Sequence, residues 1–183
     1  MEQPSMNRKS FEGLTLEGMS AHIANAMLLY RGGLGTRNDC KLTIAHLLRQ
    51  YQARLVADAL EVPYTPAARR ADLVGEPTEL EHAIPVGCLM NVLFEYAHGT
   101  TVQELAFTAT ALVNQNTILS RVTPAEHALL NKQCQSSMPL GFATYPWQNV
   151  WARYVHAGVD APEDATSVES LEHYLSRRDK SAA

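Results

Sequence analysis

Apolar side chains recur at every third or fourth position in several stretches of this chain, which is the spacing of one face of an α-helix. The first stretch covers residues 16–30 and is followed by two glycines of the kind that end a helix. The second begins after a glycine-bearing turn, with Asn38 or Asp39 as its cap, and its apolar positions continue to Val62. The first third of the sequence therefore predicts two successive helices.

The pattern changes after these helices. Residues 63–77 contain three prolines and little periodicity, which predicts a surface loop with at most one short turn of helix. Residues 80–86 (LEHAIPV) include Pro85, which blocks a helix and favours a short extended piece. Residues 117–122 alternate loosely and carry β-branched side chains, which predicts a second strand. We therefore expect a small two-stranded β element.

The remaining periodic stretches predict further helices. One covers residues 86–96, and the next two each open on a capping box, at 101–104 (TVQE) and 123–126 (TPAE). The helix that starts at the first box is expected to end at Val113, because an Asn-Gln-Asn sequence follows it. The last predicted helix covers residues 147–156 and is followed by a glycine.

Together these elements predict a mainly α protein. We expect one compact helical domain of about six helices with a small two-stranded β element, covering residues 13–160. Residues 1–12 are expected to be disordered, and residues 161–183 to form a polar tail that could hold a short helix. The chain has 183 residues, of which 46% are hydrophobic, and this is enough for one core.

The overall charge narrows the choice of partners. The formal net charge is −4, so the protein as a whole does not attract nucleic acid or an anionic membrane. The polar N-terminus and the short apolar runs favour a cytoplasmic protein without a membrane partner. Contact with phosphates would need local basic residues. The candidates are Arg69, Arg70, Arg121 and Lys132.

An acidic residue and a histidine stand side by side at Glu81 and His82. Neighbouring side chains on a strand point to opposite faces, but a bend at Pro85 can bring the two together. The carboxylate could then hold a divalent cation, and the imidazole, which titrates near neutral pH, could take a proton from water. The helix after the second strand offers His127 and Asn131, four residues apart on one face, to complete the metal shell.

This combination resembles the His-Me finger nucleases, the HNH-like or ββα-metal endonucleases. The matching pieces are residues 81–85 (EHAIP), the predicted second strand, and the helix that carries His127 and Asn131. The resemblance implies a metal-dependent endonuclease that hydrolyses phosphodiester bonds of DNA or RNA. It implies His82 as general base, Glu81 as a metal ligand, and Asn131 or His127 as the ligand from the helix, with Mg²⁺ or another divalent ion bound.

The sequence departs from this family in two ways, and the same residues also have purely structural interpretations. Two predicted helices separate the strands, where family members commonly have a short loop, and the paired CxxC zinc motifs of many members are absent. His82 could hydrogen-bond to the backbone at the edge of the core, beside a solvated Glu81. His127 could simply be exposed, and Asn131 could end its helix.

A second hypothesis comes from the C-terminal part of the domain. Trp147, Trp151 and Tyr154 would share one face of the last predicted helix, with Arg153 beside them. Core packing is the commoner meaning of such a stripe, and a partner-binding face is the other. This alternative is a small non-enzymatic interaction or inhibitor protein, of phage, plasmid or bacterial accessory type, that binds a protein or nucleoprotein partner. It requires an exposed apolar patch, whereas the nuclease requires its acidic, histidine and helix residues to converge at an open point.

Overall fold

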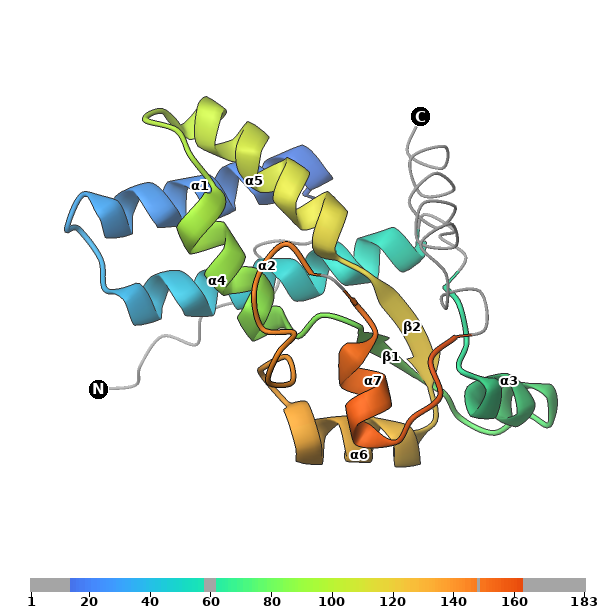
Figure 1. Cartoon of the computed structure of the whole chain (residues 1–183). Helices are drawn as coiled ribbons and strands as arrows, with labels where there is room; N and C mark the ends of the chain where they lie inside the picture. The colour runs from blue at the N-terminus through green and yellow to red at the C-terminus, as the bar shows by residue number, and fades with distance from the viewer. Residues whose placement is uncertain (1–13, 58–61, 148, 163–183) are drawn as a thin grey trace, which may run out of the picture.

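The computed structural model describes residues 14–57, 62–147 and 149–162 of the chain (Figure 1). These ranges hold seven helices and two strands. In chain order they are α1 (Leu16–Arg31), α2 (Arg37–Ala57), α3 (Pro66–Leu73), β1 (Glu79–His82), α4 (Val86–Tyr96), α5 (Val102–Asn116), β2 (Leu119–Val122), α6 (Pro124–Cys134) and α7 (Ala152–Ala157). The predicted class, mainly α with a small two-stranded β element, is confirmed. The predictions for residues 1–12 and for nearly all of 161–183 lie outside the described residues.

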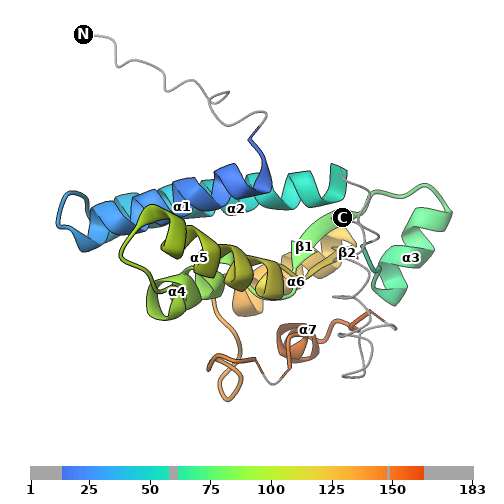
Figure 2. The same cartoon turned by 90° about the horizontal axis from the view of Figure 1, so that it is seen from above.

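Four helices form the first half of the molecule. α1 packs against α2 and α5, and α4 packs against α2 and α5 (Figures 1 and 2). Their inward faces build one core cluster, which we call the bundle core. Its fully buried members include Ile23, Met27, Ile44, Leu47, Leu89, Leu93 and Leu105.

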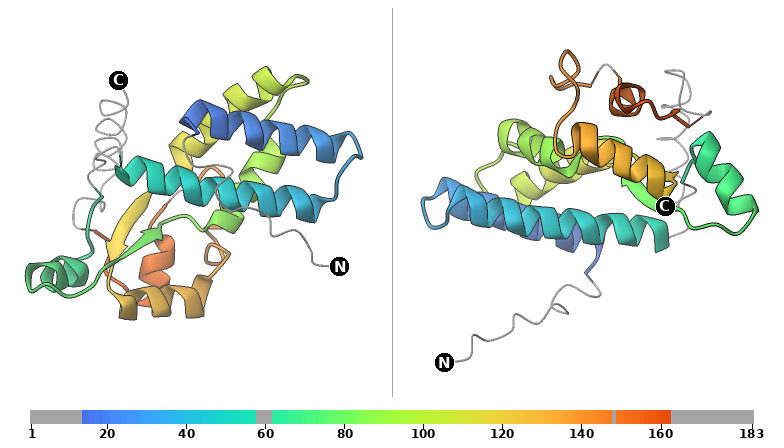
Figure 3. Two further views of the ribbon diagram at one scale, coloured as in Figure 1. Left: turned by 180° about the vertical axis from the view of Figure 1, so that it is seen from behind. Right: turned by 90° about the horizontal axis from the view of Figure 1, so that it is seen from below.

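The second half is built around the sheet. β1 and β2 are antiparallel, with Glu79 opposite Val122 and His82 opposite Leu119. The sheet lies between α2 on one side and α6 with α7 on the other, and α3 stands at its edge (Figures 2 and 3). A second cluster, which we call the sheet core, fills the space under α6 and α7. It includes Ile84, Ile118, Val122, Leu130, Trp151 and Tyr154.

Local side-chain hydrogen bonds set the start of α6. Thr123 is its N-cap, with Glu126 completing the capping box, and Pro124 takes the first helical position. Glu126 is buried and also accepts a hydrogen bond of 2.8 Å from the hydroxyl of Thr65, the N-cap of α3. One carboxylate therefore joins the starts of α3 and α6, and this fixes α6 against the sheet.

Some element boundaries differ from the predicted ones. α2 is capped by Thr36, which exchanges hydrogen bonds with Asp39, its described part ends at Ala57, and Val62 is not helical. The region predicted as a loop contains the two-turn helix α3. α5 continues to Asn116, because the side-chain amide of that residue bonds back to the carbonyl of Leu112 at 2.8 Å and so stays within the helix.

The last helix is shorter than predicted. α7 begins at Ala152, because the side chain of Asn149 accepts a hydrogen bond of 2.9 Å from the backbone N–H of Trp151, which forms a turn just before the helix. Trp147 therefore does not share a helical face with Trp151 and Tyr154. α7 ends at Gly158 in the left-handed conformation, as the sequence predicts.

No helix in the described ranges is both long and apolar enough to cross a lipid bilayer.

Candidate functional site

The face of the sheet that is turned towards α6 carries an acidic pair. Glu79 and Glu81 are two residues apart on β1 and so lie on the same face, opposite Val122 and Ser120 of β2. His127 of α6 meets both carboxylates. Its Nδ1 atom lies 2.5 Å from Oε2 of Glu81, and its Nε2 atom lies 3.6 Å from Oε2 of Glu79. The strand and the helix thus bring two acids and one imidazole together.

Asn131 completes this group from the next turn of α6. Its Nδ2 atom lies 2.7 Å from Nε2 of His127, as expected for two residues four apart on one helix face. A half-turn of the amide would present its oxygen to the same place. The cluster of Glu79, Glu81, His127 and Asn131 is called the carboxylate–histidine cluster below. It contains three of the residues that the sequence predicts as metal ligands.

A buried arginine holds the inner acid of the cluster in place. Nη1 of Arg153, on α7, donates to Oε1 of Glu81 at 2.6 Å and to the backbone carbonyl of His82 at 2.8 Å. The arginine side chain is 1% exposed and that of Glu81 is 9% exposed. Each of these two buried charges is stabilised by the other, because a buried ion without a partner costs several kcal/mol of desolvation. Arg153 therefore ties α7 to β1 and fixes the position of the Glu81 carboxylate.

The two sides of the cluster differ in access to solvent. Both oxygens of Glu81 are engaged, one by Arg153 and the other by Nδ1 of His127. On the other side, the side chain of His127 is 34% exposed and that of Glu79 is 44% exposed. The carboxylate at Nδ1 favours the imidazole tautomer with its proton on that atom, so the lone pair of Nε2 faces the open side.

His82 lies on the opposite face of the sheet from this cluster. Its partner in the register is Leu119, which packs into the bundle core together with Leu80. The turn at Pro85 comes after the strand has ended, so the alternation of side chains along β1 still holds at His82. The predicted convergence of His82 with the metal ligands at one open point therefore does not occur, and the geometry gives no support to its predicted role as general base.

The surroundings of His82 also work against proton transfer. The residue is 8% exposed, and burial lowers the pKa of its imidazole to about 4, with the guanidiniums of Arg153 and Arg49 adding to the effect. The ring is thus neutral at physiological pH, but it is a weak base.

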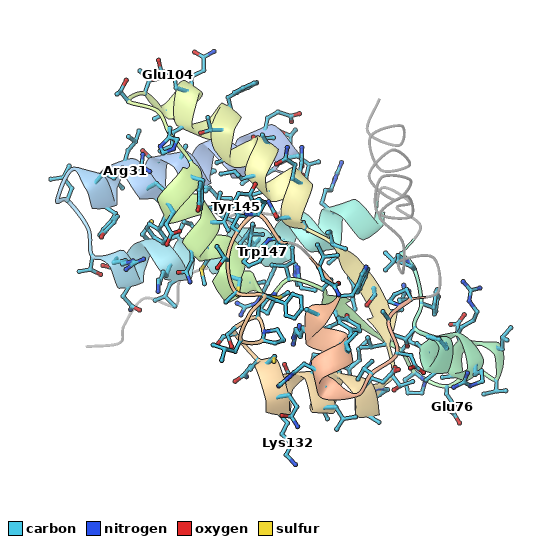
Figure 4. The ribbon with its side chains drawn as sticks, in the orientation of Figure 1. Arg31, Glu76, Glu104, Lys132, Tyr145 and Trp147 are labelled. Atoms are coloured by element: carbon cyan, nitrogen blue, oxygen red, sulfur yellow. The ribbon has the colours of Figure 1, made fainter. Side chains whose placement is uncertain are left out.

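The basic residues predicted to contact nucleic acid do not form one surface. Arg69 and Arg70 are exposed on α3, while Arg121 is half-buried on β2. Lys132 is exposed on α6 and points away from the body of the protein (Figure 4). Two of the four, Arg69 and Arg121, approach one aromatic ring.

The residues of the predicted partner face are mostly in the core. Trp151, Arg153 and Tyr154 are 5%, 1% and 0% exposed, and the hydroxyl of Tyr154 shares a buried hydrogen bond of 2.7 Å with Ser120. Trp147 is half-buried, and its indole N–H bonds to Asn116 while its ring packs on Tyr145 over α4 (Figure 4). Core packing, the commoner meaning of the stripe, is what these residues show.

The donors of the carboxylate–histidine cluster suit a divalent ion. Carboxylate, imidazole and amide oxygen are the ligands that Mg²⁺, Mn²⁺ and related ions take from proteins. In the part of the chain that the structure describes, no group of three or more His, Cys, Asp or Glu side chains is placed so that it could hold a metal ion. The Nε2 side of His127 nevertheless offers the imidazole, Glu79 and the amide of Asn131 as three donors, with Glu81 behind Nδ1 as the orienting carboxylate.

Comparison with known proteins gives no family for this chain: no family model, curated protein or solved structure matches it.

Two members of the site were not predicted from the sequence in the roles they have. Glu79 is two residues before Glu81, and the alternation along a strand would have placed the two acids on one face. Arg153 was assigned to a partner face, and no local pattern links it to Glu81, 72 residues earlier in the chain.

Proposed function

We propose that the protein is a metal-dependent nuclease that hydrolyses phosphodiester bonds of DNA or RNA at the carboxylate–histidine cluster. One observation carries the proposal. Glu81 of β1 and the pair His127 and Asn131 of α6, chosen from the sequence as ligands of one cation, are brought together by the fold, and His127 contacts both of the others. The paired strands followed by α6 also have the ββα order of the HNH-like nucleases that the sequence resembles.

Each residue of the cluster has a role in this proposal. His127 Nε2, Glu79 and Asn131 hold the cation on the open side, and Glu81 holds the imidazole in the tautomer that leaves Nε2 free to bind it. Arg153 holds the Glu81 carboxylate in place by a hydrogen bond. A divalent ion at this place would stabilise charge on the phosphate and lower the pKa of a bound water. The assignment gives Glu81 an orienting role in place of direct ligation.

The alternative of a non-enzymatic interaction protein is not favoured by a specific observation. Three of the four residues that suggested it, Trp151, Arg153 and Tyr154, are buried, and Arg153 binds Glu81. These three are therefore not available as a docking face, and Trp147 is half-buried.

The test is a cleavage assay on labelled single- and double-stranded DNA and on RNA, with Mg²⁺, Mn²⁺ or a chelator. Mn²⁺ binding to the same samples is measured in parallel by calorimetry. We expect metal-dependent cleavage by the natural protein, and loss of both cleavage and Mn²⁺ binding in His127→Ala and Glu79→Gln. His156→Ala, which changes an exposed histidine of α7, is the matched control and should behave as the natural protein.

The His82→Asn variant distinguishes a catalytic centre at His127 from one that uses His82 as general base. Because His82 is on the far face of the sheet, a folded His82→Asn protein should still cleave. Loss of cleavage in that variant, with Mn²⁺ binding retained, would return the general-base role to His82 and contradict the assignment made here. Absence of cleavage with every substrate and metal would reject the nuclease.

A further inference from the structure

A second polar feature lies at the outer edge of the sheet, apart from the carboxylate–histidine cluster. Tyr64 precedes α3 and forms a parallel bridge with Arg121 of β2. Hydrogen bonds from Arg121 N to Pro63 O (2.8 Å) and from Thr65 N to Arg121 O (3.0 Å) fix this backbone. The guanidinium carbons of Arg69 and Arg121 lie 5.5 and 5.7 Å from the centre of the Tyr64 ring. We call these three residues the tyrosine–arginine site.

The two positive charges of this site have no acidic partner. In the described ranges neither Arg69 nor Arg121 forms an ion pair, and the Nη1 atom of Arg121 reaches only the hydroxyl of Thr78, at 3.5 Å. Arginine stays charged at every physiological pH, so the two guanidiniums repel each other. The ring offsets part of this repulsion by cation–π attraction, and it holds both groups in place. Two ordered, unneutralised guanidiniums are a binding site for a shared anion, and phosphate fits their paired donors best.

The location connects this site with the cluster. Arg121 is opposite Leu80, which stands between Glu79 and Glu81 on β1. Neighbouring strands are about 4.8 Å apart, so the backbone of Arg121 is one strand spacing from the strand that carries both acids. Arg121 and the two acids nevertheless lie on opposite faces of the sheet. A phosphate at the tyrosine–arginine site would therefore be a different one from the phosphate beside His127.

We propose that the tyrosine–arginine site binds a phosphate of a nucleic-acid backbone and so holds the strand beside the carboxylate–histidine cluster. Binding itself does not depend on cleavage. Its role in presenting a substrate rests on the proposed nuclease function. Because the protein is acidic overall, this local pair of positive charges is also the means by which it overcomes its general repulsion of polyanions.

The experiment measures binding of a short fluorescein-labelled DNA oligonucleotide by anisotropy, in EDTA, over a series of salt concentrations. EDTA removes divalent ions, so the labelled strand is not cut and the cluster does not contribute a metal-bound contact. Each phosphate contact on a single strand adds about 0.7 to the slope of log affinity against log salt. Because the two arginines share one phosphate, Arg69→Gln/Arg121→Gln should lower the slope by about 0.7, and Arg69→Gln alone should lower it by part or all of that amount.

Arg70→Gln is the matched control, because it removes the same charge from the neighbouring position of α3, where the side chain is exposed and has no contact with Tyr64. Its slope should equal that of the natural protein. Arg69 is also exposed, so the single variant keeps the test valid if the double variant does not fold. Equal slopes for Arg69→Gln and Arg70→Gln, or no binding of the oligonucleotide in EDTA, would overturn the proposal.

Two further arms distinguish the source of the phosphate. Inorganic phosphate should compete only weakly, and vesicles containing phosphatidylserine should not bind. Tight binding of either one, without binding of the oligonucleotide, would also overturn the proposal. The His127→Ala variant distinguishes failure of the proposed nuclease function from failure of the phosphate site. It should lose cleavage and keep its affinity for the oligonucleotide in EDTA.

Discussion

The two ring nitrogens of His127 have different surroundings, and this difference decides what the residue can do. Nδ1 is enclosed beside the carboxylate of Glu81, which Arg153 holds from the other side. Nε2 faces Asn131 and the half-exposed Glu79. The series Arg153–Glu81–His127 thus runs from a fully buried guanidinium to a partly exposed imidazole, and each member fixes the next.

The first prediction concerns the buried end of this chain. Arg153→Met should destabilise the protein by about 3–5 kcal/mol, because it leaves the carboxylate of Glu81 buried without a cation. Arg153→Met/Glu81→Gln should be less destabilised than Arg153→Met alone, since both charges are then gone. Urea unfolding of four proteins measures this: the natural protein, Arg153→Met, Glu81→Gln and the double variant. Additive losses in the double variant would show that the two residues are not coupled.

The second prediction concerns His82 and pH. Its pKa is about 4 in the folded protein and 6.5 as a free side chain, so folding favours the neutral ring. The resulting stability is complete above 6.5 and is lost as the pH falls towards 4. Between about pH 7.5 and about pH 5 the natural protein should lose about 2 kcal/mol more of its unfolding free energy than His82→Asn does. Parallel pH profiles for the two proteins would contradict the buried, neutral imidazole.

At the scale of the elements, the sequence predicted which helices and strands exist better than it predicted the residues at which they begin and end. Both capping boxes, a short strand that includes Glu81 and the left-handed glycine after α7 could be foreseen, because each depends on residues within one or two turns. The end of α5 and the start of α7 could not. Asn116 continues its helix by bonding back to it while its side-chain oxygen accepts from the distant Trp147, and Asn149 delays the start of α7 through the backbone N–H of Trp151.

The third prediction compares the two capping boxes. Thr123→Ala and Thr101→Ala each remove an N-cap side chain, and each should cost about 1 kcal/mol in chemical unfolding. Thr123 starts the helix that carries His127, whereas Thr101 starts α5, far along the chain from the cluster. Only Thr123→Ala should also weaken Mn²⁺ binding in calorimetry. Equal Mn²⁺ affinity in the two variants would show that the start of α6 does not position His127.

At the scale of the whole molecule, two core clusters share one helix. α4 contributes Leu89 and Leu93 to the bundle core and Cys88 to the sheet core. The segment just before it, Ala83 and Ile84, also belongs to the sheet core. A helix that packs into both clusters makes it difficult for one of them to unfold alone, so we expect the described part of the chain to unfold as a single unit.

The fourth prediction tests this coupling. Both tryptophans lie in or against the sheet core, whereas the long helices of the bundle dominate the far-UV circular dichroism. Leu47→Ala removes a fully buried side chain from the bundle core and should cost about 2–5 kcal/mol. Tryptophan fluorescence and circular dichroism should both shift by that amount in urea. A change in unfolding free energy seen by circular dichroism but not by fluorescence would show that the two core clusters unfold separately.

The arrangement of the clusters also explains what the sequence could not show about the site. The ligand types and their helix spacing could be found from the sequence, since His127 and Asn131 are local neighbours. The contacts of Arg153 with Glu81 and of Arg69 and Arg121 with Tyr64 join distant parts of the chain. Such contacts depend on the packing of whole elements, for which no short pattern exists. The position of His82 depends on where β1 ends relative to Pro85, a shift of one residue.

The separation of β1 and β2 by α4 and α5 has a consequence for the newly made chain. Glu81 leaves the ribosome long before His127, and Arg153 follows later still. β1 cannot pair with β2 until the segment between them, which holds α4 and α5, brings their ends together. This closure costs conformational entropy, and contacts formed later offset that cost. A nascent chain therefore carries the acids without the imidazole. If the carboxylate–histidine cluster cuts nucleic acid, a complete cluster can form only after the segment that holds α7 has left the ribosome. Until then the messenger RNA on that ribosome does not meet a complete cluster on its own nascent chain.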